Sequence, residues 1–278
     1  MELESSSSHN FVEHPPAVDS TSPSLRNDHD GNAFEIKFLL PFAVAKEVLD
    51  RARRHMQLDP HCEPQLGEAY EVHGLYFDTN DFHVYHRLNS HAVHKLRLRR
   101  YGRMPSVFLE HKAKVKGRVR KHRTPLEDDQ IPMLVAPRLP EAWTGSWFRK
   151  RLKSRRLHPT CEVSYLRTAF MGSDGAESFR LTIDRHLRCR RFVGWDVRGV
   201  DEGIFVLENQ MIMELKFCDA MPLFFKNLLA DLKLAPESVS KYRMSVEACG
   251  LVVPAVSDAL PMDTTHDKGA DENALRSA

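Results

Sequence analysis

Residues 93–115 read VHKLRLRRYGRMPSVFLEHKAKV, and their alternation of charged and apolar residues predicts part of a β-sheet. Successive side chains of a strand point to opposite faces of the sheet. In the first half of the stretch, Lys95, Arg97 and Arg99 therefore share one face, and the leucines between them share the other. The pattern predicts a strand over Val93–Tyr101 with a cationic face.

The second half of the stretch predicts a neighbouring strand over Val107–Val115, after a turn at Tyr101–Pro105. Glu110, Lys112 and Lys114 share one face of this strand, opposite apolar residues. An ordinary solvated face would carry serine, threonine and scattered charges, whereas this one is almost purely ionic.

Two distant segments repeat the same Glu-x-Lys arrangement, at Phe34–Leu40 and at Met211–Phe217. An antiparallel sheet with one solvated face also alternates in this way, so a single copy indicates little. Three copies beside an Arg-x-Arg strand instead favour a charged channel for a polyanion. The additional charged residues on the same faces are Glu35, Lys37, Glu214 and Lys216.

The basic charge is regional, although the 278-residue chain has a net charge of only +2. Between Arg87 and Arg123 there are thirteen lysines or arginines and a single acidic residue, Glu110. Two like charges about 7 Å apart repel by roughly 2 kcal/mol at an effective dielectric constant of 20. Gathering so many around one cavity therefore requires an anionic ligand or interleaved carboxylates.

Composition excludes several protein classes. The hydrophobic fraction is 42%, and no stretch approaches the roughly 18 apolar residues of a membrane span. The five cysteines are widely spaced and never form Cys-x-x-Cys, which argues against a zinc ribbon or a disulfide framework. The N-terminus shows no secretory signal, so we expect a protein of the reducing cytoplasm.

The chain is expected to fold as one α+β domain over residues 33–253, between polar and disordered tails at 1–32 and 254–278. Helices are predicted after Pro41, over Trp143–Leu157 and after a cap at Asp219, and the folded part ends with Ser240–Val246. Further antiparallel strands complete a sheet that could close into a barrel. They are predicted at Tyr70–Phe77, Glu162–Met171, Phe179–Leu187, Phe192–Trp195 and Ile204–Phe217.

Eight short motifs, in this order, resemble the catalytic domain of the vacuolar transporter chaperone (VTC) polyphosphate polymerases, a branch of the triphosphate tunnel metalloenzymes related to CYTH proteins. The resemblance covers residues 33–250. It implies a closed, eight-stranded antiparallel tunnel barrel with flanking helices. The motifs are FEIKF (34–38), YFDT (76–79), KLRLR (95–99), FLEHK (108–112), YLRTAF (165–170), FRLTID (179–184), MELKF (213–217) and SKYRMS (240–245).

The same resemblance implies transfer of the terminal phosphate of ATP to a growing inorganic polyphosphate chain, with Mn²⁺ or Mg²⁺ as cofactor. Glu214 corresponds to the metal-binding carboxylate. The catalytic cations would be Lys37, Arg97, Arg99, Lys112, Arg180 and Lys216. The remaining substrate-binding positions would be Arg167, Lys241, Lys121, Arg123, Glu35 and Glu110.

One departure from the wider superfamily concerns the first strand, where Ala33 replaces the first acid of Glu-x-Glu-x-Lys. VTC-type domains share this shortened form, which favours a polymerase. The alternatives are a tunnel triphosphatase that hydrolyses tripolyphosphate or nucleoside triphosphates, and a non-catalytic polyphosphate-binding module. ATP and polyphosphate are the expected partners, nucleic acid is not expected, and any membrane-protein partner is unknown.

Three other features are interpreted structurally. The histidines between His73 and His94 match no metal-ligand motif and are interpreted as surface or hydrogen-bonded residues. Asp78, within YFDT, is predicted to orient its neighbours. The basic face of the helix at Trp143–Leu157 is interpreted as solvated, with a phosphate-binding surface as the alternative.

Overall fold

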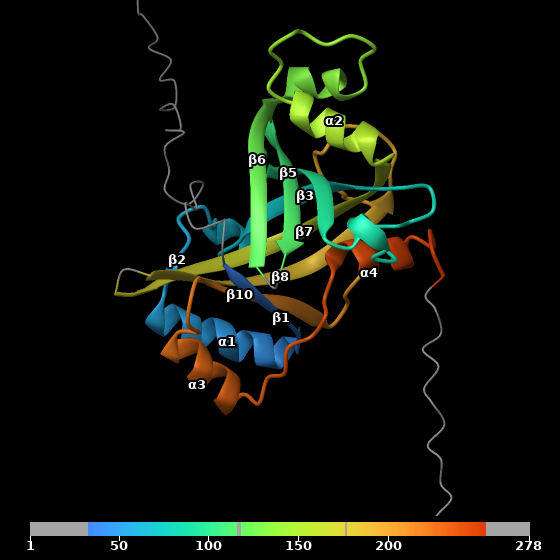
Figure 1. Cartoon of the computed structure of the whole chain (residues 1–278). Coiled ribbons are helices and arrows are strands. Elements are labelled where there is room, and N and C mark those ends of the chain that lie inside the picture. The colour runs from blue at the N-terminus through green and yellow to red at the C-terminus, as the bar shows by residue number, and fades with distance from the viewer. Residues whose placement is uncertain (1–32, 116–117, 176, 254–278) are drawn as a thin grey trace, which may run out of the picture.

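Ten strands form one antiparallel sheet in the computed structural model, which describes residues 33–115, 118–175 and 177–253 (Figure 1). The two predicted tails lie outside the described residues. Eight strands are long and two are short. The strands are β1 (Phe34–Pro41), β2 (Gln57–Leu58), β3 (Tyr70–Asp78), β4 (His94–Tyr101), β5 (Ser106–Val115), β6 (Arg118–Glu127), β7 (His158–Asp174), β8 (Glu177–Arg191), β9 (Ile204–Phe205) and β10 (Gln210–Phe217).

Helices cover the outer face of this sheet, in the α+β arrangement that the sequence predicted (Figure 1). Four are α-helices and three are short 3₁₀ turns in the described part of the chain. They are α1 (Phe42–His55), η1 (Pro64–Leu66), η2 (Asn89–His91), η3 (Asp128–Leu134), α2 (Ser146–Ser154), α3 (Leu223–Asp231) and α4 (Lys241–Ala248).

The sheet does not close through its backbone. The long strands follow the order β1-β10-β8-β7-β3-β4-β5-β6, and the described residues show no pairing between the end strands β1 and β6. Some Cα atoms of these two strands nevertheless approach within 8 Å. The predicted closed barrel is therefore only partly confirmed. The sheet curls on itself, and a side-chain ion pair, rather than backbone hydrogen bonds, joins β1 to β5.

The hydrophobic core lies outside the curled sheet, between the strands and the helices. Ala45, Val48 and Ala52 of α1 pack with Phe225 of α3 against apolar residues of β1, β8 and β10. A second cluster joins β3, β4, β5 and β7 to α2 and α4. Because apolar side chains point outward to the helices, the alternating charged side chains must point inward.

One strand was not predicted, and four expectations about other elements were wrong. Strand β6 was not predicted, because Pro125 interrupts its pattern; an end strand tolerates proline, which lacks a backbone donor. Phe192–Trp195 is not a strand, and the expected strand from Ile204 is interrupted between β9 and β10. Asp219 does not cap α3, which begins after Pro222. Helix α2 is shorter than predicted.

Asp78 orients its neighbours, as predicted. Its carboxylate accepts hydrogen bonds from the backbone N–H groups of Val84 and Tyr85, at 2.8 and 2.9 Å. It also accepts a hydrogen bond from the hydroxyl group of Tyr242 on α4. This buried carboxylate therefore fixes the start of α4 against the loop that follows β3.

Candidate active site

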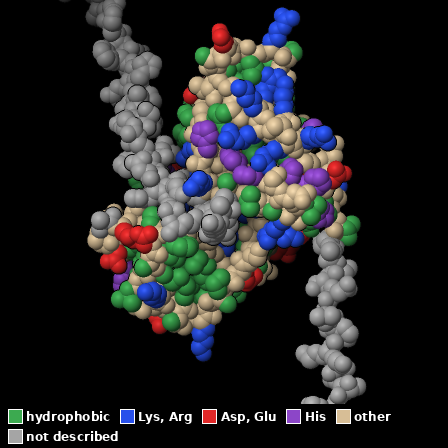
Figure 2. All heavy atoms as spheres, in the orientation of Figure 1, with side chains coloured by type: hydrophobic (Ala, Val, Ile, Leu, Met, Phe, Trp, Pro, Cys, Tyr) green, Lys and Arg blue, Asp and Glu red, His purple; other side chains and the backbone are tan. Residues whose placement is uncertain are grey.

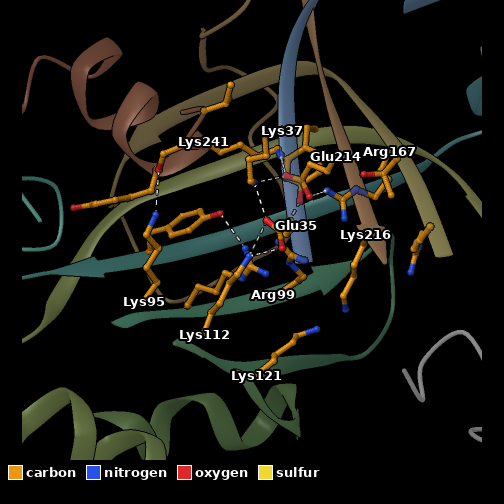
Figure 3. Close-up of a pocket in the computed structure, with 18 of the residues that line it drawn as sticks. Glu35, Lys37, Lys95, Arg99, Lys112, Lys121, Arg167, Glu214, Lys216 and Lys241 are labelled. Carbon is orange, nitrogen blue, oxygen red and sulfur yellow. Dashed lines mark hydrogen bonds and ion pairs between the residues drawn. The ribbon is translucent and has the colours of Figure 1, made fainter. Parts of the chain in front are cut away.

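A large cavity of about 700 Å³ runs inside the curled sheet, and we call it the bore (Figure 3). Each of the eight long strands contributes at least one side chain to its lining, together with residues 236–242 at the start of α4. All the predicted site residues except Glu110 line it: Glu35, Lys37, Arg97, Arg99, Lys112, Lys121, Arg123, Arg167, Arg180, Glu214, Lys216 and Lys241.

Strand register explains how the charges interleave. The two Glu-x-Lys motifs of β1 and β10 run antiparallel, so Lys37 lies opposite Glu214 and Glu35 lies opposite Lys216. Cross-strand neighbours on one face stand within contact distance, which favours opposite charges there. On the other side of the bore, Glu110 of β5 lies between Arg97 of β4 and Arg123 of β6. Each carboxylate therefore holds the cations beside it.

Glu214 is the centre of one cluster (Figure 3). Its carboxylate oxygens lie 2.6 Å from Lys37 Nζ, 2.9 Å from Lys241 Nζ and 3.3 Å from Arg167 Nη2. Burial acts to raise its pKa, but Lys241, Lys37 and Arg167 hold the pKa of Glu214 well below its usual range. Glu214 is therefore ionised near neutral pH.

Glu110 is the centre of a second cluster, behind the bore lining. It is 1% exposed. Its carboxylate accepts hydrogen bonds from Arg97 Nε at 2.6 Å and Arg123 Nε at 3.0 Å, and lies 3.3 Å from Lys121 Nζ. Burial acts to raise the pKa of Glu110, but the surrounding arginines and Lys121 hold it well below the usual value. Glu110 positions these cations rather than facing the bore.

Glu35 joins opposite sides of the bore. Its carboxylate lies 2.6 Å from Lys112 Nζ of β5 and 3.1 Å from Lys37 Nζ on its own strand. Burial raises the pKa of Glu35, but Lys37 and Lys112 outweigh this effect and lower it. This ion pair across the cavity supplies the contact that the backbone of β1 does not make.

Two aspartates of the site were not predicted as site residues. Asp184 accepts two hydrogen bonds from Arg167, both of 2.6 Å, and pairs with Lys241. Asp59, in the loop after β2, lies 2.8 Å from Arg180 Nη2. The alternation in FRLTID already placed Asp184 on the face of Arg180. No sequence signal marks Asp59, because a loop residue has no strand period.

Tyrosine hydroxyl groups form the other unpredicted part of the site. Each accepts a hydrogen bond from an arginine of the bore, at 2.6–3.3 Å. Burial acts to raise the pKa of Tyr101, but Arg99 and Arg123 lower it to about 7. Tyrosines in strands resemble core residues, so no sequence signal marks this role. The pairs are Tyr76 with Arg97, Tyr165 with Arg99, Tyr101 with Arg123 and Tyr70 with Arg180.

Lys95 differs from the cations described above because no carboxylate in the described part of the chain lies within 4.0 Å of it. Its Nζ atom donates to Ser240 Oγ at 3.3 Å (Figure 3). Its register partner is another cation, Lys112. Burial first, and then the nearby Lys37, Lys112 and other cations, lower the pKa of Lys95 to about 7.

The carboxylates of the bore suit a hard divalent cation. Glu35 Oε1 and Glu214 Oε1 both contact Lys37 Nζ, at 3.1 and 2.6 Å, so they lie no further apart than the sum of those distances. Mg²⁺ typically takes one or two carboxylates and completes its shell with water and substrate phosphates. The described residues contain no group of three or more His, Cys, Asp or Glu arranged to hold a metal alone. The donor set therefore fits an ion shared with phosphate.

The protein-family model described as VTC domain matches residues 32–249. The chain belongs to the VTC family.

The VTC domain of this chain also resembles several solved structures at low identity. An adenylate cyclase candidate of Bacillus halodurans is 13% identical, covers 76% of this chain and 94% of its own, and gives a TM-score of 0.46. HpAC1 of Hippeastrum, described as having a dominant triphosphatase activity, is 16% identical, with coverages of 80% and 98% and a TM-score of 0.44. PH1819 of Pyrococcus horikoshii is 13% identical, with coverages of 77% and 98% and a TM-score of 0.40.

No curated protein sequence matches this chain significantly. Among the described residues, no helix has the length and apolar character that crossing a membrane requires.

Proposed function

We propose that this VTC domain is a polyphosphate polymerase that transfers the terminal phosphate of ATP to the end of an inorganic polyphosphate chain, assisted by a divalent metal ion. The observation that carries the proposal is the bore itself, a cavity inside the curled sheet that is lined by cations from seven of the eight long strands and by interleaved carboxylates. Arginine forks bind phosphate oxygens through two bonds, and lysines supply point charge. A linear row of phosphates matches such a lining.

Lys37 remains charged, and two arginines of the bore have donor capacity left for a ligand. Burial lowers the pKa of Lys37, but Glu214 and Glu35 outweigh it and raise the pKa above its ordinary value. Arg99 Nε and Arg180 Nε are buried without hydrogen-bond partners. Buried donors are normally satisfied, so these atoms support the binding of an acceptor such as a phosphate oxygen.

The carboxylates favour transfer to phosphate over hydrolysis. A hydrolase must activate water, and a carboxylate base for that task needs a pKa near the working pH. The pKa values of Glu35, Glu110, Asp184 and Glu214 are all lowered by neighbouring cations. An acceptor phosphate is already ionised near neutral pH and needs no such base.

In the proposed mechanism the chain contributes positioning and charge neutralisation. Lys37, Arg97 and Arg99 hold the triphosphate and the acceptor end in line, while Glu110 keeps the two arginines in place. Triphosphate tunnel proteins generally use a divalent metal. Glu214, with Glu35 beside it, would hold this ion, which neutralises charge on the transferring phosphoryl group.

The test is incubation of the purified protein with ATP and Mn²⁺, followed by gel separation of polyphosphate and measurement of orthophosphate. We expect chains longer than three phosphates, and their loss in the Glu214→Gln variant. Arg53→Gln, which changes an ion pair on α1 outside the bore, is the matched control and should leave synthesis intact. Release of orthophosphate without chains would instead assign the domain as a triphosphatase.

A further inference from the structure

A second basic region lies outside the bore, on α2 and the residues that follow it. From Ala142 to Cys161 the sequence contains six lysines or arginines and no acidic residue. Arg149 is buried, and its guanidinium donates to the backbone oxygen of Ala136, so it holds the helix in place. The remaining five cations form what we call the outer basic surface: Lys150, Arg151, Lys153, Arg155 and Arg156.

The outer basic surface differs from the arginine pairs of α1 in having no carboxylate partners. On α1, Arg51 pairs with Glu47 and Asp231, and Arg53 also has acidic partners. None of the five cations on and after α2 lies within 4.0 Å of a carboxylate in the residues that the structure describes. Figure 2 shows Lys, Arg and His side chains gathered on the upper half of the face in view, where α2 lies.

Burial and the positive charge of this surface lower the pKa of a histidine beneath it. His94 Nδ1 lies 2.9 Å from His111 Nε2, and His111 is the register partner of His122. Burial first, and then Arg151 and other basic groups, lower the pKa of His111 to about 4. The imidazoles are therefore neutral near pH 7 and add no positive charge, but they also offer no anion to neutralise Arg151 and Arg155.

The outer basic surface contacts a loop that also lines the bore. Arg155 Nη1 lies 3.4 Å from the backbone oxygen of Ser90, and His91 contacts the backbone oxygen of Arg155. The same loop supplies Arg87 and Val93 to the bore lining. A chain that leaves the bore past Lys95 and this loop would therefore meet cations at once.

We propose that the outer basic surface binds the part of a polyphosphate chain that extends beyond the bore. This inference rests on the proposed function, because it takes the occupant of the bore to be polyphosphate. Nucleic acid fits less well. Single-stranded nucleic acids are bound by stacking bases on exposed aromatic rings. The aromatic ring of α2 that could serve, Trp147, already contacts Arg151 and His122, with centroid distances of 5.1 and 4.0 Å.

The test compares tripolyphosphate, which is short enough for the bore, with a chain of roughly a hundred phosphates, using the full-length protein. The variant replaces three exposed cations, Lys150→Gln, Lys153→Gln and Arg156→Gln. We expect its affinity for the long chain to fall at least tenfold and the slope of log affinity against log salt to decrease by about 2, since each contact contributes about 0.7. Affinity for tripolyphosphate should not change, which also shows that the variant folds.

The matched control removes three exposed cations of α1, by Lys46→Gln, Arg53→Gln and Arg54→Gln, and should leave long-chain binding unchanged. Equal long-chain affinity of the α2 variant and the wild type would overturn the inference. Equally strong competition by single-stranded DNA of the same charge would also overturn it, because the surface would then not be a polyphosphate site. Failure of the wild type to bind tripolyphosphate would count against the bore and the proposed function, and not against this surface.

Discussion

Lys37 on β1 and Glu214 on β10 are register partners whose side chains meet inside the bore, with Nζ and Oε1 2.6 Å apart. In the proposed polymerase, this carboxylate is bonded to a lysine that the phosphate chain would need. Glu214 would therefore have two opposing effects. It would compete with phosphate for Lys37, and it would offer a ligand to the metal ion that accompanies phosphate.

Glu214→Gln is expected to strengthen the metal-free binding of tripolyphosphate and to reduce the effect of the metal ion on binding. Without metal, tripolyphosphate should bind about tenfold more tightly, because a charge-assisted bond of about 1.5–3 kcal/mol to Lys37 no longer has to be broken. Added Mn²⁺ should then strengthen binding less than in the wild type. Calorimetric titration with and without metal measures both effects. Weaker metal-free binding in the variant would show that Glu214 does not restrain Lys37.

Glu110→Gln tests a carboxylate that organises the site from behind. Glu110 is 1% exposed and compensates Arg97, Arg123 and Lys121. Removing one partner of a buried ionic group costs about 3–5 kcal/mol. We expect the free energy of unfolding in urea to fall by about 3 kcal/mol. Asp50→Asn, which affects an exposed pair on α1, should cost less than about 0.5 kcal/mol, and an equal loss in both variants would contradict the assignment.

Binding of tripolyphosphate is expected to take up a proton at Lys95. The pKa of Lys95 is lowered to about 7 in the free protein, and a phosphate nearby must raise it. The contribution of Lys95 to affinity is thus complete below pH 7 and is lost as the pH rises through the bound-state pKa. Titration at pH 7.5 in buffers of different ionisation enthalpy measures the uptake. Proton exchange by the substrate itself is the same for wild type and Lys95→Met, so the difference between the two proteins reports Lys95. Equal proton uptake in both would exclude Lys95 as the group that is protonated.

Lys95→Met is expected to stabilise the free protein. Between pH 7 and the ordinary lysine pKa, the unfolded chain binds a proton at Lys95 that the folded protein does not hold. Protonation therefore opposes folding, and wild-type stability should rise with pH across this window, by about 1.4 kcal/mol for each unit. Thermal unfolding at pH 7 should show a higher Tm for Lys95→Met. The difference should shrink towards pH 10, and a pH-independent difference would indicate a packing effect instead.

The charged face of each Glu-x-Lys or Arg-x-Arg strand could be predicted because a strand has a period of two. That period placed Lys37, Arg97 and Glu214 on one face before any contact was known, and the structure brings them into one cavity. It also placed Asp184 beside Arg180, although that position was not assigned a role. Local alternation therefore determines which side chains face inward.

Other parts of the site depend on features that local alternation does not contain. Tyr101 resembles a core residue in sequence, and its contact with Arg123 follows only from the pairing of three strands. Asp59 reaches Arg180 from a loop. Closure depends on the summed twist of all strands, which local alternation does not determine. The family resemblance implied a closed barrel, whereas the structure joins β1 to β5 through Glu35 and Lys112.

Ala33→Glu tests why the first strand carries a single acid. Position 33 precedes Glu35 by two residues, so it shares the inward face of that chain segment, and Ala33 lines a small pocket together with Arg180 and Lys216. A carboxylate there would pair with these cations and add an oxygen ligand beside the proposed metal-binding carboxylates. Because the proposed polymerase must bind a phosphate acceptor through the cations of the bore, the extra acid should weaken acceptor binding and favour water. We expect the ratio of orthophosphate to chain product to rise at least tenfold with ATP and Mn²⁺.

Ala33→Gln, of similar size but neutral, is the control. An equal shift in both variants would assign the effect to crowding of the buried Ala33 position rather than to charge.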